Sequence, residues 1–139
     1  MSEDLRVKEA NARFYEALSS QNMELMDTVW LHETWTKCVH PGWEILVGWK
    51  RIRESWANIF RNAEYLKINI SNLSIEVGDQ IAWVVCTENI ASAHDADYQV
   101  ATAQATNIYY KVNNEWFLVH HHASPVAVDT PLEASETIQ

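Results

Sequence analysis

The chain has 139 residues, of which 47% are hydrophobic and 21% charged, and its formal net charge is −9 at pH 7. This length fits one globular domain with a hydrophobic core, and the negative charge excludes partners that need a basic surface, namely nucleic acid and anionic membranes. No apolar run approaches the roughly 20 residues of a membrane-spanning helix, and the N-terminus lacks the basic start and apolar stretch of a signal peptide. We therefore expect a soluble, cytoplasmic protein.

Three helices are predicted in the first half of the chain. Ser2 is followed by two acidic residues, which is typical of a helix start, and apolar residues then recur at helical spacing through about Ser19. A polar break over residues 19–22 separates this helix from a short one, Met23 to about Val29. The third helix is predicted from Trp49 to Asn62, with apolar residues on one side and charged residues on the other.

Between the second and third helices the pattern changes to aromatic, β-branched and turn residues. Thr34 to Val39 is predicted as a short strand. His40-Pro41-Gly42 is predicted as a tight turn, because proline fixes one backbone dihedral and glycine accepts an unusual one. Glu44 to Val47 is compatible with a second short strand before the third helix begins.

The remainder of the chain predicts four long strands that follow one another. They are Tyr65 to Val77, Ile81 to Ile90, Tyr98 to Val112 and Glu115 to Pro125. The second of them is continuously apolar, which is typical of a central strand covered on both faces. Turn signals lie between them at Gly78-Asp79, at residues 94–97 and at Asn113-Asn114, so the strands should form an antiparallel meander.

This order of elements predicts an α+β domain. The N-terminal helices should pack on the concave face of a curved antiparallel sheet, made of the four-strand meander plus the short strands, and enclose a pocket. One domain is expected over residues 1–128, followed by an acidic tail over 129–139. The opposite sheet face is also apolar, so we expect a homodimer that forms through this face.

Histidines at the end of the last strand are the first candidates for chemistry. In a regular strand, one face carries Trp116, Leu118, His120 and His122. His40 ends a predicted strand near the helices and could meet His120 and His122 in one pocket, where imidazole would suit general acid–base catalysis near neutral pH. The alternative is that His40 orders its turn while the other two form hydrogen bonds within a polar core.

The aromatic residues are expected to divide between a ligand pocket and core or interface packing. Seven tryptophans provide much amphipathic surface, which suits a flat organic ligand as well as it suits packing. The residues assigned to the pocket are Tyr15, Trp30, Cys38, Trp56 and Asn107. The residues assigned to the dimer interface are Trp83, Phe117 and Val119.

Metal binding and nucleophilic catalysis are the weaker interpretations. A His-x-His pair with a third histidine, and with Glu44 or Glu88 as a carboxylate, is compatible with metal ligands, but it lacks the close spacing of known metal motifs. Cys38 lies two residues from His40, and it could act as a nucleophile only if the strand between them is regular. Cys38 and Cys86 are far apart in apolar runs, as expected of buried free thiols in a reducing compartment. We predict no metal and no cofactor.

Four motifs of the chain are similar to those of a known family. They are Phe14-Tyr15-x-Ala17-Leu18, Cys38-Val39-His40-Pro41-Gly42, Gly48 leading into Ile52-x-x-x-Trp56-x-x-Ile59-Phe60, and Trp116-x-Leu118-Val119-x-His121-His122-x-Ser124. Together they resemble the SnoaL-like group of the nuclear transport factor 2-like superfamily, over about Val7 to Pro125. The resemblance implies a cone-shaped α+β fold, usually dimeric across the sheet, with a pocket between the helices and the inner sheet face.

Members of that superfamily include ketosteroid isomerases, polyketide cyclases, dehydratases and association domains, so the fold alone does not select a function. The aspartate and tyrosine pattern of the isomerases and the acid–base aspartate of the cyclases have no match that can be placed in this sequence. We expect a pocket for a small apolar or polycyclic organic ligand and cofactor-free isomerisation, cyclisation or dehydration through a histidine. The alternative is a non-catalytic association or ligand-sensing module that acts through dimerisation.

Overall fold

A computed structural model describes residues 2–127 of the chain. Its helices are α1 (Glu3–Ser20), α2 (Met23–Val29) and α3 (Trp49–Asn62). Its strands are β1 (Lys37–Val39), β2 (Leu46–Val47), β3 (Tyr65–Val77), β4 (Ile81–His94), β5 (Asp97–Val112) and β6 (Glu115–Pro125). The predicted α+β order of elements is confirmed, and the tail expected over 129–139 lies outside the described residues.

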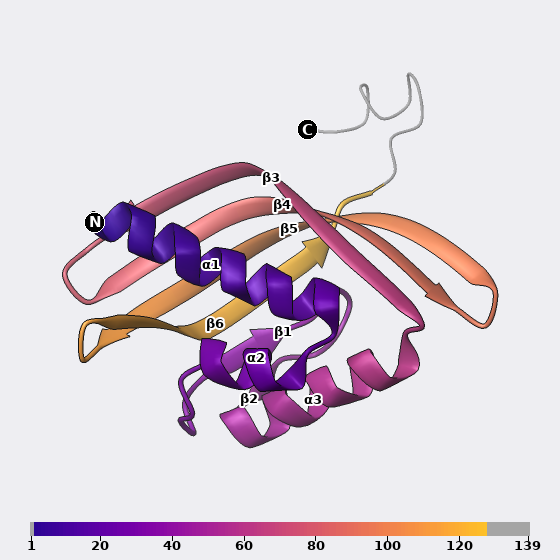
Figure 1. Cartoon of the computed structure of the whole chain (residues 1–139), viewed down its shortest axis with the longest axis horizontal. Helices are drawn as coiled ribbons and strands as arrows, with labels where there is room; N and C mark the ends of the chain where they lie inside the picture. The colour runs from indigo at the N-terminus through magenta and orange to yellow at the C-terminus, as the bar shows by residue number, and fades with distance from the viewer. Residues whose placement is uncertain (1, 128–139) are drawn as a thin grey trace.

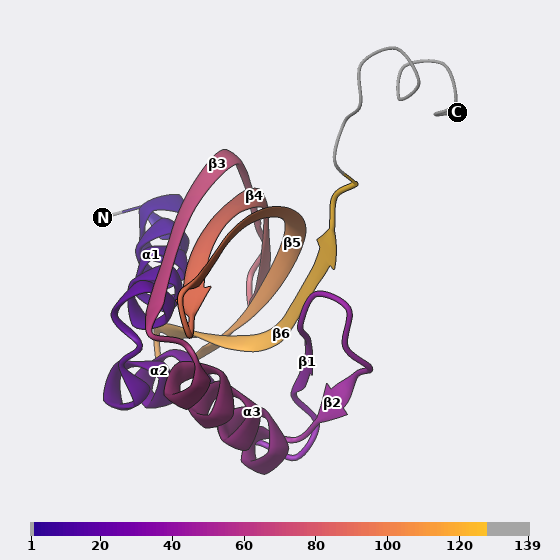
Figure 2. The same ribbon diagram turned by 90° about the vertical axis from the view of Figure 1, so that its right-hand side faces the viewer.

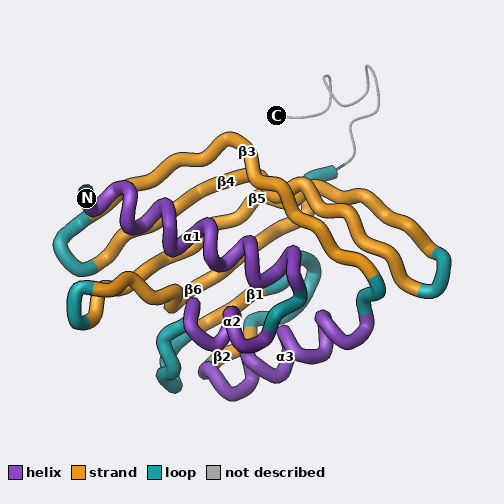
Figure 3. The backbone as a smooth tube through the Cα atoms, viewed as in Figure 1, coloured by secondary structure: helices purple, strands orange, loops and turns teal. Residues whose placement is uncertain are grey.

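All six strands form one curved sheet that does not close into a barrel, in the order β2-β1-β6-β5-β4-β3. Strands β3 to β6 are the predicted antiparallel meander, whereas β1 pairs parallel to β6 and antiparallel to β2. Helix α1 crosses one face of the sheet, and α2 and α3 lie beside one another below it (Figures 1 and 3). Seen from the side, the long strands arch over this helical layer (Figure 2).

Helix α1 begins and ends where its capping residues place it. The Ser2 Oγ accepts a hydrogen bond from the backbone N–H of Leu5 at 3.2 Å, which satisfies one of the free amides of the first turn. The helix ends at Ser20, the capping residue Gln21 has a left-handed φ of 51°, and the N–H of Asn22 bonds back to the Ala17 carbonyl at 3.0 Å. Residues on one side of the helix are buried against the sheet, so α1 covers its inner face.

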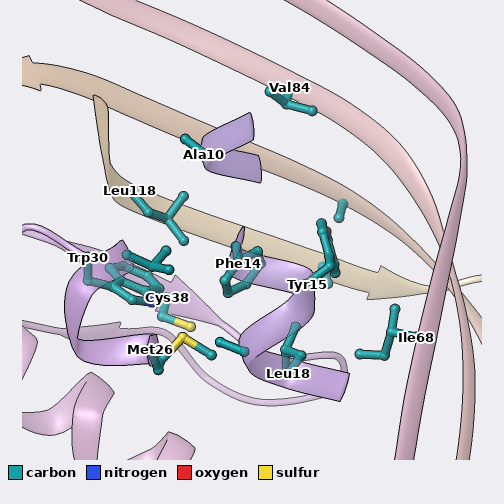
Figure 4. Close-up of a cluster of buried hydrophobic side chains, with 14 of the residues drawn as sticks. Ala10, Phe14, Tyr15, Leu18, Met26, Trp30, Cys38, Ile68, Val84 and Leu118 are labelled. Atoms are coloured by element: carbon teal, nitrogen blue, oxygen red, sulfur yellow. The ribbon is translucent and has the colours of Figure 1, made fainter. Parts of the chain in front are cut away.

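The hydrophobic core lies between the helices and the inner face of the sheet (Figure 4). Phe14 of α1 is fully buried at its centre. Its ring lies 4.8 Å from Tyr15, 5.8 Å from Trp56 and 4.9 Å from His121, measured between ring centroids. These rings come from α1, α3 and β6, so Phe14 holds the three elements around one point.

Helix α3 is held beside the other two helices by polar contacts at both ends. The Gln21 side chain donates from Nε2 to the carbonyl oxygens of Phe60 and Ala63 at 2.9 and 2.8 Å. The guanidinium of Arg53 donates from Nε to the carboxylate of Asp27 on α2 at 2.7 Å. These contacts fix the end of α1 and the middle of α2 against α3.

A β-bulge in β6 changes which side chains face the core. His120 pairs with Ile108 on β5, but the next pair is Leu118 with Tyr109, so Val119 is an extra residue. Trp116 and Leu118 face the helices before the bulge, and His121 and Ala123 face them after it, as their burial shows. The expectation that His120 shares a face with Leu118 is therefore wrong, because regular alternation is broken between them.

Some strand boundaries also differ from those expected. The strand predicted from Thr34 begins only at Lys37, because the Thr36 hydroxyl donates to the Glu33 carbonyl at 3.0 Å and closes a turn there. Strand β4 continues past Ile90 to His94, since the hairpin to β5 is tight and pairs His94 with Asp97. The β4–β5 hairpin is therefore longer than predicted, and it projects beyond the helices (Figure 1).

Candidate functional site

Polar side chains lie buried together between α1 and the inner face of the sheet, and we call this group the polar centre. Its members are Asn11 and Tyr15 of α1, Glu88 of β4, Asn107 and Tyr109 of β5, and His121 of β6. The two α1 residues are four apart and the two β5 residues two apart, which are the spacings that put side chains on one face. None of these residues is more than 5% exposed, so each polar atom depends on the others for hydrogen bonds.

The amide of Asn107 sets the direction of the hydrogen bonds in the polar centre. Its Nδ2 donates to Asn11 Oδ1 at 3.0 Å and to Tyr15 Oη at 3.1 Å. Its Oδ1 then faces His121 Nδ1 at 2.6 Å. A carbonyl oxygen can only accept, so the proton of the His121 ring lies on Nδ1. The neutral His121 ring therefore carries its lone pair on Nε2.

The Tyr15 hydroxyl continues this chain of hydrogen bonds to Glu88. Its hydroxyl accepts from Asn107 and donates to Glu88 Oε2 at 2.7 Å, with Cys86 Sγ a further 3.4 Å contact. Tyr109 supports the same arrangement by donating from Oη to Asn11 Oδ1 at 2.7 Å. Of the buried side-chain polar atoms in the polar centre, Asn11 Nδ2 is the one without a hydrogen-bond partner among the described residues.

Glu88 and His121 form a pair of titratable groups without a nearby cation. His121 Nε2 lies 3.9 Å from Glu88 Oε2. Burial lowers the pKa of His121 well below its usual value, since the protonated ring loses its hydration, and the nearby His40 contributes in the same direction. Burial raises the pKa of the Glu88 carboxyl, although the hydrogen bond from Tyr15 opposes that shift. A neutral imidazole base thus lies beside a carboxyl that holds its proton more tightly than usual.

His40 lies next to the polar centre, but its ring is hydrogen-bonded to a residue of α3. The Ser55 hydroxyl donates to the Ile52 carbonyl at 2.7 Å, so it accepts from His40 Nε2 at 2.8 Å. Desolvation lowers the pKa of His40 to about 4, so the ring is neutral at pH 7. Cys38 Sγ lies 3.8 Å from the same ring, and burial raises the pKa of this thiol far above its usual value. His40 therefore connects the end of β1 to α3, and Cys38 stays protonated.

A groove of about 390 Å³ opens on the inner side of the projecting β4–β5 hairpin. It is lined by Trp43, Asn58, Ile59, Asn62, Ala63, Ser92, Ala93, His94, Asp97 and Gln99. The ring of Trp43 lies 4.7 Å from His40, His40 lies 4.5 Å from Trp56, and Trp56 lies 6.0 Å from His121. A row of aromatic rings thus leads from the groove to the polar centre.

The sequence of residues 7–129 matches the SnoaL-like domain family. The chain belongs to the SnoaL-like domain family. A proposed dehydratase of the NTF2-like family from Streptomyces avermitilis is 32% identical, with a TM-score of 0.85 and coverage of 91% of this chain and 97% of that one. The predicted membership and the NTF2-like fold are both confirmed.

More distant relatives of this SnoaL-like chain differ from one another in kind. A proposed calcium/calmodulin-dependent protein kinase type II association domain from Thiobacillus denitrificans is 23% identical, with a TM-score of 0.77 and coverage of 86% of this chain and 94% of that chain. The F-box protein SKIP8 of Arabidopsis thaliana is 22% identical over 119 residues, which are 86% of this chain and 49% of that protein. The chain thus spans about half the length of this curated relative. The first of these likenesses shows the fold alone.

The residues assigned from sequence to the pocket of the SnoaL-like domain lie in different places. Tyr15 and Asn107 belong to the polar centre. Trp56 and Cys38 adjoin it, because Trp56 contacts both His40 and His121 and Cys38 pairs with His121 across β1 and β6. Trp30 is buried further off, where its ring contacts Phe14 and Trp49. Their role in ligand binding stays a prediction.

His120 and His122 lie on the face of the sheet that points away from the helices. Both border an outer hollow of about 430 Å³, with Val85, Gln104, Ala105, Thr106, Ile108 and Ser124. Their rings are 6.2 Å apart and do not meet His40, which is on the inner side. The expected convergence of the three histidines is therefore wrong, because the bulge at Val119 turns His121 inward in place of its neighbours.

The residues assigned to the dimer interface also separate. Trp83 is 46% exposed on the outer face of β4, beside Val85 at 39%. Phe117 is half-buried on β6, and Val119 is only 9% exposed because it occupies the bulge. Trp83 and Phe117 can contact a partner, whereas Val119 has little surface to offer.

Sequence reasoning assigned no role at the site to His121 or Asn11, it named Tyr109 only as a possible wall of an apolar pocket, and it named Glu88 only as a possible metal ligand. Glu88 had a usable signal, since an acidic residue within the apolar run 81–90 must find buried hydrogen-bond partners. His121 had none, because no residue pattern marks the bulge that turns it inward. Among residues 2–127, no three His, Cys, Asp or Glu side chains are grouped closely enough to hold a metal ion. In the same range no helix is long and apolar enough to cross a membrane.

Proposed function

We propose that this SnoaL-like domain binds a small, largely apolar organic molecule beside the polar centre and transfers a proton with the pair formed by His121 and Glu88. The single observation that carries the proposal is the buried pair itself: a neutral imidazole with its lone pair on Nε2, 3.9 Å from a carboxyl group. Groups whose environments shift their pKa values in opposite directions are typical of acid–base sites. Isomerisation, cyclisation and dehydration all need such proton transfers.

Four members of the polar centre have distinct parts in this proposal. His121 Nε2 is the base, because Asn107 holds the ring proton on Nδ1. Glu88 is the acid that returns a proton, and the Tyr15 hydroxyl orients its carboxyl at 2.7 Å. The rings of Phe14 and Trp56 provide the apolar wall next to His121, and exclusion of water there strengthens the electrostatic interactions.

The base can be tested with 5-nitrobenzisoxazole, a flat molecule that opens to a coloured nitrophenolate when a base removes its carbon-bound proton. The reaction breaks the C–H and N–O bonds and leaves the proton on the base. We expect the wild-type chain to accelerate ring opening beyond free imidazole, and His121→Gln to lose at least about tenfold of that rate, since a positioned base contributes about 10²–10⁴-fold. Absorbance of the product gives the rate directly.

His122→Gln is the matched control, because it removes the neighbouring imidazole on the outer face. It should retain the wild-type rate. Circular dichroism establishes that each variant folds, and Glu88→Gln tests the same pair if His121→Gln does not fold. A wild-type rate no higher than that of free imidazole, or loss of the rate in His122→Gln alone, would contradict the proposed centre.

Dimerisation through the outer sheet face is a second part of the proposal. Ile81, Trp83 and Val85 of β4 point outward with 49, 46 and 39% of their surfaces exposed. Tyr110 on the neighbouring strand contacts the exposed Trp35 edge-to-face at 6.1 Å, which extends the apolar surface. Exposed apolar patches of this kind mark interaction surfaces. This surface also favours the alternative function, an association module that acts through dimerisation.

Trp83→Glu should convert the dimer to a monomer, because the charge would be buried without a partner at the interface. Sedimentation equilibrium measures the mass directly. Leu5→Glu is the matched control, since Leu5 is 50% exposed on α1, away from the outer sheet face. A monomeric wild-type chain, or a Trp83→Glu variant that is still dimeric, would rule out this interface.

The cytoplasmic location expected from two buried free cysteines stays part of this proposal.

A further inference from the structure

The inner face of the β4–β5 hairpin becomes polar where the hairpin projects past the helices (Figure 1). Ile90 still packs against the hydrophobic core. Beyond it, strand alternation puts Ser92 and His94 on the same inner face, and they pair with Gln99 and Asp97 of β5. All four side chains line the groove of about 390 Å³ beside the hairpin. The groove therefore has a polar wall where the apolar inner face of the sheet ends.

Helix α3 and the β1–β2 loop supply the other walls of the groove. Asn58 and Asn62 are four residues apart, so they lie on one side of α3. Asn58 Oδ1 accepts a hydrogen bond from the guanidinium of Arg61, which leaves Asn58 Nδ2 to donate to a ligand. Trp43 is 47% exposed, its backbone N–H donates to the His40 carbonyl at 2.9 Å, and its ring lies 4.7 Å from the His40 ring. The indole is thus held in place while much of it stays open to the groove.

The groove is polar but offers no cation to a ligand. His94 and Asp97 are the ionisable groups among the described residues that line it, and no lysine or arginine is among them. His94 lies 3.3 Å from a second carboxylate, that of Asp95. A phosphate or carboxylate would therefore meet Asp97 without a counter-charge. A wholly apolar ligand would displace water from the amide side chains without replacing its hydrogen bonds. The lining thus favours an uncharged ligand with many hydrogen-bonding groups.

A sugar ring has the groups that this lining requires. Its hydroxyls both donate and accept hydrogen bonds, as do the amides of Asn58, Asn62 and Gln99. The C–H groups on one face of the ring can lie on the indole of Trp43, because the negative face of an aromatic ring attracts such hydrogens. We infer that the groove binds the ring of an uncharged sugar, with Trp43 against one face of the ring and the amides around its edge.

A nucleobase is a poorer match to the same groove. Its polar atoms lie in one plane, and flipped bases are held between aromatic or apolar side chains on both faces. Trp43 supplies the one indole or phenyl ring among the described residues that line the groove, and the wall formed by the hairpin is polar. The hydroxyls of a sugar point in several directions and can reach both walls. This sugar site goes beyond the proposed function and does not rest on it.

Chemical shifts of the ¹⁵N-labelled wild-type chain measure the binding. The probes are methyl β-D-glucoside, methyl β-D-galactoside and methyl α-D-mannoside, with methyl β-D-glucuronide as an anion of nearly the same shape. We expect at least one neutral glycoside to shift the indole N–H signal of Trp43, with a dissociation constant of about 1 mM, as ligands of this size reach. The glucuronide should bind at least about fivefold more weakly than the tightest of the three, because it meets Asp97 with a like charge.

Trp43→Ala removes the aromatic face and should weaken binding of the tightest glycoside at least about tenfold. Trp43→Phe keeps such a face and should stay within about threefold of the wild type. Tyr98→Ala is the matched control: Tyr98 is 66% exposed on the same hairpin, and alternation between Asp97 and Gln99 directs it to the outer face. It should bind as the wild type does. If Trp43→Ala does not fold, Gln99→Ala should still weaken binding about threefold, the effect of one hydrogen bond.

Three results would each overturn the inference. They are no shift of a groove signal by any glycoside at about 20 mM, tighter binding of the glucuronide or of uridine than of every glycoside, and equal effects of Trp43→Ala and Tyr98→Ala. The benzisoxazole assay remains independent, because neither His121 nor Glu88 is among the described residues that line the groove. A chain that binds no sugar but opens benzisoxazole would keep the proton-transfer centre and lose only the sugar site.

Discussion

Replacing Asn107 with alanine should lower the free energy of unfolding by about 3 kcal/mol, which is at the upper end of the cost of an unsatisfied buried polar group. The Asn107 amide holds Asn11, Tyr15 and His121 through contacts of 3.0, 3.1 and 2.6 Å. Its loss leaves the buried His121 Nδ1–H without an acceptor, and an unsatisfied buried donor costs about 1–3 kcal/mol. Urea unfolding followed by tryptophan fluorescence measures this change.

Thr102→Ala is the control for this measurement, because Thr102 is exposed on the same strand. Its effect should stay within about 0.5 kcal/mol, as expected for surface substitutions. Asn107→Ala should also let the ring proton of His121 move between its two nitrogens, which ¹⁵N NMR detects. A loss no larger than that of Thr102→Ala, with an unchanged His121 tautomer, would show that the Asn107 amide does not order the polar centre.

Most elements of the fold could be predicted because local patterns determine them. Helix α3 and strands β3 and β6 have the bounds expected from apolar periodicity and turn residues. Asn113 and Asn114 both adopt positive φ angles of 52° and 65° in the predicted hairpin turn, since asparagine tolerates this region. Such signals depend on neighbours in the sequence, so they can be read without knowledge of the tertiary structure.

The parallel pairing of β1 with β6 could not be predicted in the same way. It joins Cys38 to His121, more than 80 positions away along the chain, and three residues carry too little pattern to specify a partner. The bulge at Val119 could not be predicted either, because it arises from the register between β5 and β6. This one residue decides which histidine faces the core, so the candidate site was misplaced although the strand itself was correctly predicted.

Acidification from pH 7 to pH 4 should destabilise the fold, and His40 should account for a large share of the loss. Its pKa is about 4 in the folded chain against 6.5 for the free side chain, so between these values the unfolded chain binds the additional proton. The free energy of unfolding therefore falls as the pH decreases through this window, by about 3 kcal/mol for His40 alone. The lowered pKa of His121 acts in the same direction.

Glu88 opposes this trend, because its raised pKa means that the folded chain binds a proton more readily than the unfolded chain above pH 4.5. A variant therefore isolates the contribution of His40 to the change in unfolding free energy with pH. His40→Gln should flatten the fall in unfolding free energy between pH 7 and pH 4, each variant being compared with itself at pH 7 in urea titrations. His122→Gln, which changes an exposed histidine on the outer face, should retain the wild-type slope. Equal slopes in the two variants would mean that the Ser55 contact and the burial of His40 do not keep this ring neutral.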